Sequence, residues 1–394
     1  MKLTGSLYLG WRHLQRHKAK TALLTGALTL AVFLPVGVSL FVSQAETRLR
    51  ARAVETPLLL GAPGSPLELV FNGLYFNQPE LAPLTMRQMH ETREGNWGHA
   101  IPLNARYHAR GHRIVGTSLD YFTFRRLSIA QGTQMVRLGD CVLGASVARQ
   151  WELGPGDHVI SSPEALFDMA GVYPLKMRIT GVLAPTGGAD DRAIFTDVKT
   201  TWVISGLAHG HQDATKVSDN EVLGKAKDGT VTLNASVVEY NEITPDNVAS
   251  FHFHGDSEDF PLTSAIILPR DHKGKTILLG RYQDRKGEVQ LVEPPLVMDN
   301  LFTTVFQIRD VVVAALALVA GAALLISALV FALSHRLRQR EFDSLKAIGA
   351  DAASLRALIL FEGGFVIVAS LAMAGLLTAI LRALAPWLVR LVAG

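Results

Sequence analysis

Two pairs of histidines in the middle of the chain have the residue type and spacing of a metal site. His252 and His254 flank Phe253, so on a β-strand both imidazoles point to the same face. His209 and His211 repeat this spacing. Imidazole nitrogens suit Zn²⁺ or a similar borderline ion, and a tight site needs three or four such ligands. The four histidines therefore predict a zinc site, and the alternative is a solvated strand face that binds no metal.

Carboxylates lie close enough in the sequence to complete such a site. Asp256, Glu258 and Asp259 follow the second pair, and Asp213 follows the first. Cys141 is the only cysteine, so neither an intrachain disulfide nor a cysteine-rich metal site can form. Apart from zinc, the sequence predicts no cofactor.

Motifs for catalysis are missing from the sequence. A P-loop requires G-x-x-x-x-G-K-[ST]. Gly274, Lys275 and Thr276 supply its end, but Pro269 stands in place of the first glycine. The G-x-S-x-G and H-E-x-x-H patterns are also absent. We therefore expect the chain not to be an enzyme, and any ATP hydrolysis linked to it to belong to a separate chain.

The composition indicates that part of the chain lies in lipid. Of its 394 residues, 48% are hydrophobic and only 19% are charged, which is unusual for a water-soluble protein. The net charge of +3 is small, and the basic residues gather beside apolar segments instead of on an aromatic-rich face. Membrane lipid is thus an expected partner, and nucleic acid is not.

Three apolar runs are long enough to cross a hydrocarbon core of about 30 Å as helices. They predict transmembrane helices at residues 21–44, 307–335 and 358–384. Residues 45–306, between the first two, have mixed α and β patterns, and residues 385–394 form a tail. The expected fold class is a membrane protein with three transmembrane α-helices and a large mixed α/β extracytoplasmic domain between the first two.

Basic residues predict the orientation of the chain in the membrane. They precede the first run at Lys2, Arg12, Arg16, Lys18 and Lys20, and follow the second at Arg336, Arg338, Arg340 and Lys346. Because cytoplasmic flanks are rich in Lys and Arg, both flanks are predicted to be cytoplasmic and the large domain exterior. Residues 1–20 carry apolar side chains at helical spacing and predict an amphipathic helix in the inner interface, with a plain basic tail as the alternative.

The loop after the second run, residues 336–357, carries the most specific pattern. It predicts a short helix that ends at Gly349, with Asp351 capping the next helix. The segment Arg-Gln-Arg-Glu-Phe-Asp-Ser-Leu-Lys-Ala-Ile-Gly-Ala from Arg338 resembles the RxREIGxLKAIGA signature of MacB/FtsX-type ABC transporter permeases. The matching residues are Arg340, Glu341, Leu345, Lys346, Ala347, Ile348, Gly349 and Ala350. Asp343 stands where the family usually has Gly, and Glu362 matches an acidic residue of the family.

This resemblance implies a function and its partners. In the family, the short helix docks in a cleft of a separate cytoplasmic ATPase and transmits its nucleotide cycle to a MacB-like periplasmic domain. The implied coupling residues are Arg340, Glu341, Leu345, Lys346, Ile348 and Gly349. The family works by mechanotransmission in the bacterial inner membrane, in the export of lipoproteins, peptides or drugs. It also implies a second permease chain, and a periplasmic accessory protein is a further candidate partner.

Weaker resemblances support the family and leave alternatives. Gly144 to Asp157 resembles a periplasmic strand-helix-turn of the family. Residues 251–266, FHFHGDSEDFPLTSAI, are similar to permeases of zinc-regulated bacterial uptake systems, so a zinc-linked uptake permease is one alternative. A sensory or scaffolding membrane protein without an ATPase is another. The family has four spans, so a fourth helix is lost, supplied by another chain or missing from this sequence.

Overall fold

The computed structural model describes residues 3–77, 81–162, 174–210, 222–225, 231–233, 241–283 and 287–392. The chain forms two compact units. The first contains residues 1–50 and 300–394, and the second contains residues 51–299.

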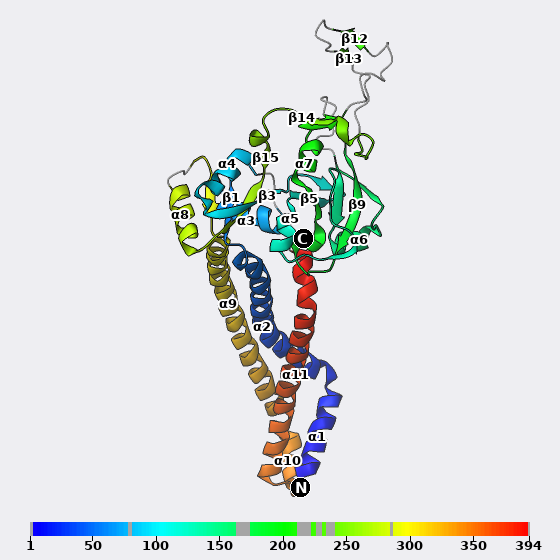
Figure 1. Ribbon diagram of the computed structural model, residues 1–394. Helices are drawn as coiled ribbons and strands as arrows, with labels where there is room; N and C mark the ends of the chain where they lie inside the picture. The colour runs from blue at the N-terminus through cyan, green and yellow to red at the C-terminus, as the bar shows by residue number, and fades with distance from the viewer. Residues whose placement is uncertain are drawn as a thin grey trace. The chain divides into compact units, whose positions relative to one another are not determined.

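The first unit is helical (Figure 1). Its helices are α1 (Leu3–Arg16), α2 (Lys18–Val54), α9 (Pro294–Leu337), α10 (Gln339–Ala347) and α11 (Ala352–Val392), with the last residues of α2 and the first of α9 in the second unit. Among the described residues, three helices are long and apolar enough to cross a membrane: Lys18–Val54, Pro294–Leu337 and Ala352–Leu384. The expected three apolar helices are confirmed. A helix satisfies all its interior backbone hydrogen bonds itself, which an apolar segment needs in lipid.

Helices α1 and α2 both contact α11 within the first unit. Trp11 of α1 meets Phe365 edge to face, with ring centroids 5.4 Å apart. The Ser370 hydroxyl of α11 donates to the Thr25 carbonyl of α2 at 3.2 Å. Small hydroxyl residues that bond across helices are typical of helix packing in lipid.

A mixed β-sheet organises the second unit (Figure 1). Its strand order is β17-β1-β16-β3-β5-β10-β7-β9-β6, with β4 on β5 and β8 on β9. The strands are β1 (Leu58–Gly61), β3 (Gly98–Asn104), β4 (His108–Ala109), β5 (His112–Thr117), β6 (Ile129–Gly132), β7 (Asp140–Leu143), β8 (His158–Ile160), β9 (Lys176–Leu183), β10 (Ile194–Asp197), β16 (Ser264–Pro269) and β17 (Gln290–Val292). The pairs β5–β10 and β7–β9 are parallel, and the other pairs of this sheet are antiparallel.

Short helices and three small strand pairs complete the second unit. The helices are α3 (Pro66–Tyr75), α4 (Met86–His90), α5 (Leu119–Phe124), α6 (Ala145–Trp151), α7 (Val198–Ile204) and α8 (His272–Gln283), with 3-10 turns η1 (Glu91–Asn96), η2 (Ala189–Arg192), η4 (Val248–Ser250) and η5 (Ser257–Asp259). The pairs are β2 (Leu84–Thr85) with β15 (Pro261–Leu262), β11 (Ala208–Gly210) with β14 (Phe251–Phe253), and β12 (Val222–Lys225) with β13 (Val231–Leu233). The expected mixed α/β domain, with its strand-helix-turn from β7 through α6 to β8, is confirmed.

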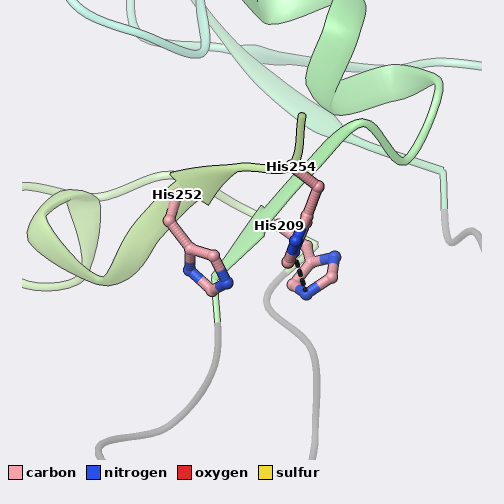
Figure 2. A group of neighbouring side chains, drawn as sticks. All are labelled: His209, His252 and His254. Carbon is pink, nitrogen blue, oxygen red and sulfur yellow. Dashed lines mark hydrogen bonds between the residues drawn. The ribbon is translucent and has the colours of Figure 1, made fainter. Parts of the chain in front are cut away.

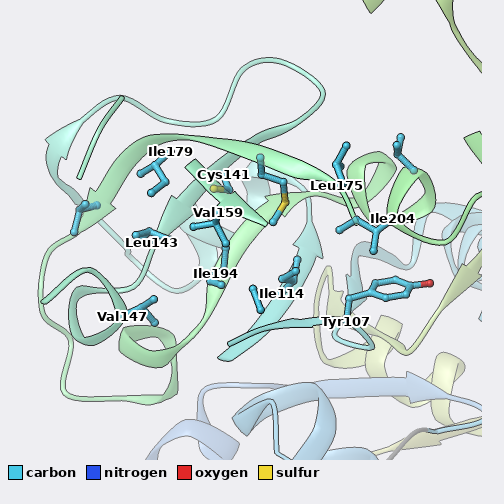
Figure 3. Close-up of a cluster of buried hydrophobic side chains, with 14 of the residues drawn as sticks. Tyr107, Ile114, Cys141, Leu143, Val147, Val159, Leu175, Ile179, Ile194 and Ile204 are labelled. Atoms are coloured by element: carbon cyan, nitrogen blue, oxygen red, sulfur yellow. The ribbon is translucent and has the colours of Figure 1, made fainter. Parts of the chain in front are cut away.

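Both faces of the sheet are covered, as strand β10 shows. Successive side chains of a strand point to opposite faces. Ile194 packs with Cys141 and Leu143 in the cluster of Figure 3. Its neighbour Phe195 packs on the other face, 5.5 Å from the Tyr121 ring. Burial raises the pKa of the Cys141 thiol, so this side chain serves packing and not thiolate chemistry.

Helix α7 lies between two hydrophobic clusters of the second unit. Val203 and Ile204 belong to the cluster around β7, β9 and β10, shown in Figure 3. Val198 and Trp202 belong to a second cluster, around β1 and β16. Strand β11 begins a few residues after this helix, so the packing of α7 in both clusters also positions β11.

A buried ion pair in the second unit joins Arg52, near the end of α2, to Asp190 in η2. The Arg52 Nη2 donates to Asp190 Oδ1 at 3.0 Å, and Nη1 donates to Oδ2. The Tyr121 hydroxyl accepts from Arg52 at 2.8 Å and donates to Asp190 at 2.7 Å. Arg52 also donates from Nε to the Leu74 carbonyl, and the Phe76 ring centroid lies 5.5 Å from its guanidinium carbon. The buried guanidinium thus contacts a carboxylate, a hydroxyl, a backbone carbonyl and an aromatic ring.

These partners keep Asp190 ionised. Burial alone would raise the pKa of Asp190, but the Arg52 charge and the hydrogen bonds from Arg52 and Tyr121 hold it below its usual value. Burial raises the pKa of Tyr121, so its hydroxyl keeps the proton that it donates. Because the pKa of Asp190 is lowered on folding, the pair stabilises the unit fully above about pH 3.9. This contribution is lost as the pH falls through the lowered value.

Replacing Asp190 tests the importance of this pair. Asp190→Asn keeps the shape of the side chain but leaves Arg52 as an uncompensated buried charge. We expect a loss of about 3–5 kcal/mol in the free energy of unfolding. Thermal unfolding of the full chain in detergent, followed by tryptophan fluorescence, measures it. Asp259→Asn, which removes an exposed partner of Arg87, is the control and should change the midpoint little. Equal midpoints for the two variants would show that the buried pair is dispensable.

Candidate functional site

Helix α10 buries one side and exposes the other. Phe342 is buried with Leu355 and Leu358 of α11, and Leu345, one turn further along α10, is partly buried against the same cluster. Ile348, directly after the helix, is 81% exposed. The other residues of the implied coupling set are also exposed: Arg340, Glu341, Lys346 and Gly349. Leu345 is thus partly packed inside the first unit, and Ile348 is an apolar side chain exposed at the surface.

The end of α10 is fixed by a glycine turn. Gly349 has φ +93°, in the left-handed region that glycine adopts without strain. The Gly349 N–H donates to the Lys346 carbonyl and the Ala350 N–H donates to the Leu345 carbonyl, both at 2.9 Å. This pair of bonds is a Schellman motif, so the predicted stop at Gly349 is confirmed. The turn presents Ile348 at the surface of the loop.

An ion pair ties the start of this loop to α11. Arg338 Nη1 donates to both carboxylate oxygens of Glu362, at 2.9 and 3.0 Å, and the two side chains are only 15% and 9% exposed. Arg338 Nε also bonds Glu341 at 3.0 Å. Glu362 was expected from the family resemblance, but its pairing with Arg338 was not. A single carboxylate within an apolar helix requires a nearby cation, and this rule would have pointed to the arginines of the preceding loop.

Three of the four predicted metal-binding histidines meet on strands β11 and β14 (Figure 2). His209 and His252 are paired directly across the two antiparallel strands. His254 follows β14, and its backbone N–H donates to the Leu207 carbonyl at 2.9 Å, which extends the pairing. The register of the two strands thus places all three imidazoles on one face.

The three imidazoles present nitrogens to one another. The Nε2 atoms of His209 and His254 lie 3.1 Å apart, and one ligand nitrogen from each of the three rings lies within 4.8 Å of the others. The Nδ1 of His252 bonds the Ser250 carbonyl at 3.1 Å. His252 and His254 are exposed and His209 is half-buried, so an ion can reach the group from solvent. Imidazole nitrogens in this arrangement can hold a divalent transition metal.

Phe253, between His252 and His254, belongs to an aromatic cluster. Phe253 packs against Trp202 and Phe260, with ring centroids 6.4 and 5.9 Å away. His211 and Asp213 lie outside the described residues.

The carboxylates expected near the second pair contact other basic side chains. Asp256 and Asp259 pair with Arg87 at 3.0 and 3.1 Å, and Glu258 pairs with His90 at 3.0 Å. Among the described residues, the group that can hold a metal consists of the three histidines alone.

A comparison with protein families decides the class of the chain. Residues 21–237 match the model of the MacB-like periplasmic core domain. The chain belongs to this family. The match begins in the first apolar helix and covers most of the sheet of the second unit. Membership in the MacB-like family implies an ABC-transporter-type permease and confirms the predicted family. The matched residues do not include the loop after α9.

Solved structures that resemble this MacB-like chain share little sequence with it. The periplasmic region of MacB from Actinobacillus actinomycetemcomitans is 10% identical, with a TM-score of 0.35, over 62% of this chain and 92% of that one. The extracellular domain of the noncanonic ABC-type transporter YknZ from Gram-positive bacteria is 10% identical, with a TM-score of 0.33, over 60% and 98%. A domain of a permease protein from Porphyromonas gingivalis is 11% identical, with a TM-score of 0.25, over 60% and 86%. No curated protein matches the MacB-like chain. Its family membership rests on residues 21–237.

Proposed function

We propose that this chain is the membrane-spanning permease subunit of a MacB/FtsX-type ABC transporter, and that its ATPase is a separate cytoplasmic chain. Family membership supports the permease class. The three long apolar helices supply the membrane-spanning part. The N-terminus and the loop around α10 face the cytoplasm of a bacterial inner membrane, and the second unit faces the periplasm, because basic residues crowd the first two.

The exposed Ile348 carries the proposal of ATPase coupling. Its side chain stands at the surface of a loop whose start is held by the Arg338–Glu362 pair. Apolar anchors of this kind, with charged residues around them, are typical of interface hot spots, where charges set orientation and the anchor supplies affinity. Arg340, Glu341 and Lys346 are the charges that fix the register of this contact.

Mechanotransmission is the proposed mode of action. Both boundaries between the two units fall inside helices, α2 and α9, instead of inside loops. Arg52, in the last turn of α2, is bonded to Asp190 and Tyr121 in the second unit. A movement of α2 would therefore reach the periplasmic domain through this ion pair. A second permease chain completes the transporter, and lipoproteins, peptides or drugs are the substrate classes.

Two other functions make different predictions. A zinc-linked uptake permease is favoured by one observation, the group of His209, His252 and His254. A sensory or scaffolding protein would bind no ATPase. An ATPase subunit would then not co-purify with the chain.

Cysteine labelling tests the orientation of the chain. Lys346→Cys should resist a membrane-impermeant maleimide added to intact spheroplasts, because the α10 loop is cytoplasmic. Val136→Cys, at a position that is 85% exposed in the second unit, should react and is the matched control. The natural Cys141 is buried and adds little background. Rapid labelling of position 346 in sealed spheroplasts would overturn the topology.

Substitution of Ile348 tests ATPase coupling. Because Leu345 is partly buried inside the first unit, Ile348→Asp alone separates docking from internal packing. We expect recovery of the ATPase subunit with the tagged permease to fall at least ~10-fold, as for the loss of a hot spot of about 2 kcal/mol. Ile160→Asp, at an exposed isoleucine of the second unit, is the control. With equal yields of both variants in the membrane fraction, unchanged ATPase recovery for Ile348→Asp would reject the role of Ile348.

A further inference from the structure

We propose that His209, His252 and His254 bind one divalent transition-metal ion of the zinc class through three imidazole nitrogens. Among the described residues no fourth ligand joins them, so the fourth position of a tetrahedral shell is open to solvent or to an incoming donor. The site belongs to the second unit and does not depend on the ATPase-coupling role of α10.

The spacing of the nitrogens fits tetrahedral coordination. Zinc–nitrogen bonds of about 2.0–2.1 Å in a tetrahedron place two ligand nitrogens roughly 3.3–3.4 Å apart. The Nε2 atoms of His209 and His254 are already 3.1 Å apart. The third ring has its ligand nitrogen within 4.8 Å of these two, and its side chain is exposed, so a small rotation completes the set. The site therefore needs no movement of the backbone.

The hydrogen bonds leave the required lone pairs in place. When the Nδ1–H of His252 donates to the Ser250 carbonyl, Nε2 keeps its lone pair and the ring is oriented for coordination. In the hydrogen bond between His209 and His254, one Nε2 carries a proton and the other accepts it. A metal ion takes the place of that proton, which moves to the Nδ1 of the same ring. Three neutral imidazoles then face the ion.

The strands that carry the histidines are held in register. His209 is directly opposite His252, and the neighbouring pair is Gly210 with Phe251. A Cβ on Gly210 would lie 2.6 Å from Phe251 Cδ2, so glycine at this position leaves room for the Phe251 ring. Phe253 packs beneath the strands against Trp202, 6.4 Å between centroids. Sites on such strands hold their geometry better than sites on loops.

The set of donors selects both the kind of ion and the kind of site. Three nitrogens suit Zn²⁺ and Co²⁺, whereas Ca²⁺ and Mg²⁺ require oxygen ligands. Among the described residues, the carboxylates nearest in sequence, Asp256, Glu258 and Asp259, pair with Arg87 and His90. Three protein ligands with one open position are typical of sites that exchange or activate a ligand, whereas structural zinc sites have four protein ligands. We therefore infer a site that loads and releases its ion from the solvent side.

Metal titration of the purified full-length chain in detergent tests the proposal. We expect one Zn²⁺ per chain by equilibrium dialysis at micromolar metal, and intense visible absorption of tetrahedral Co²⁺ that Zn²⁺ abolishes. His252→Ala and His209→Ala should each weaken binding by more than ~100-fold, since loss of even an outer hydrogen-bond partner of a metal ligand costs about 10–100-fold. His99→Ala, which removes an exposed histidine paired with Asp120, is the matched control and should bind as the wild type does.

The same experiment distinguishes the outcomes. Wild-type protein that takes up no Zn²⁺ at micromolar concentration would refute the site, as would equal binding by wild type and His252→Ala. An absorption spectrum typical of octahedral Co²⁺ would contradict the tetrahedral three-histidine shell. Unchanged thermal unfolding of the metal-free variants shows that a loss of binding reflects lost ligands and not lost folding.

Discussion

The guanidinium of Arg52 is buried where the end of α2, helix α3, helix α5 and the turn η2 meet. The stability of the second unit depends on how the charge of Arg52 is neutralised. Burying an ion pair costs several kcal/mol per ion unless further hydrogen bonds offset the loss of water. Asp190, Tyr121 and the Leu74 carbonyl supply those bonds. Gly144 lets the turn approach, because a Cβ there would lie 2.3 Å from the Asp190 carbonyl oxygen. One charge thus holds the last turn of α2 against the rest of the second unit.

Local patterns in the sequence predicted much of the fold. The three apolar helices followed from run length alone, and the stop of α10 followed from the preference of helix ends for a glycine such as Gly349. The strand-helix-turn from β7 to β8 followed from periodicity and turn residues. Contacts between residues far apart in the sequence could not be predicted from local patterns. Arg52 and Asp190 are 138 residues apart, and the mixture of parallel and antiparallel neighbours in the sheet requires crossovers that no local pattern records.

In the candidate sites, too, local patterns were predicted and contacts between residues far apart in sequence were not. Alternation around Phe253 placed His252 and His254 on one face, but only the strand register adds His209 to them. Proximity in sequence favoured carboxylate ligands at Asp256 and Glu258, whereas in the structure these side chains pair with Arg87 and His90. Residue spacing along a chain predicts which side chains share a strand face. It does not predict which basic side chain a carboxylate contacts across the fold.

Photo-crosslinking at position 348 tests the central claim, a permease coupled to a separate ATPase, most directly. A photo-reactive amino acid replaces Ile348 in the full-length chain in cells of its own species, and adducts are identified by mass spectrometry. The account predicts an adduct with a P-loop ABC ATPase at position 348. It predicts none at position 160, an isoleucine that is 59% exposed in the second unit. Adducts at position 348 that contain no ATPase, or ATPase adducts of equal yield at both positions, would contradict it.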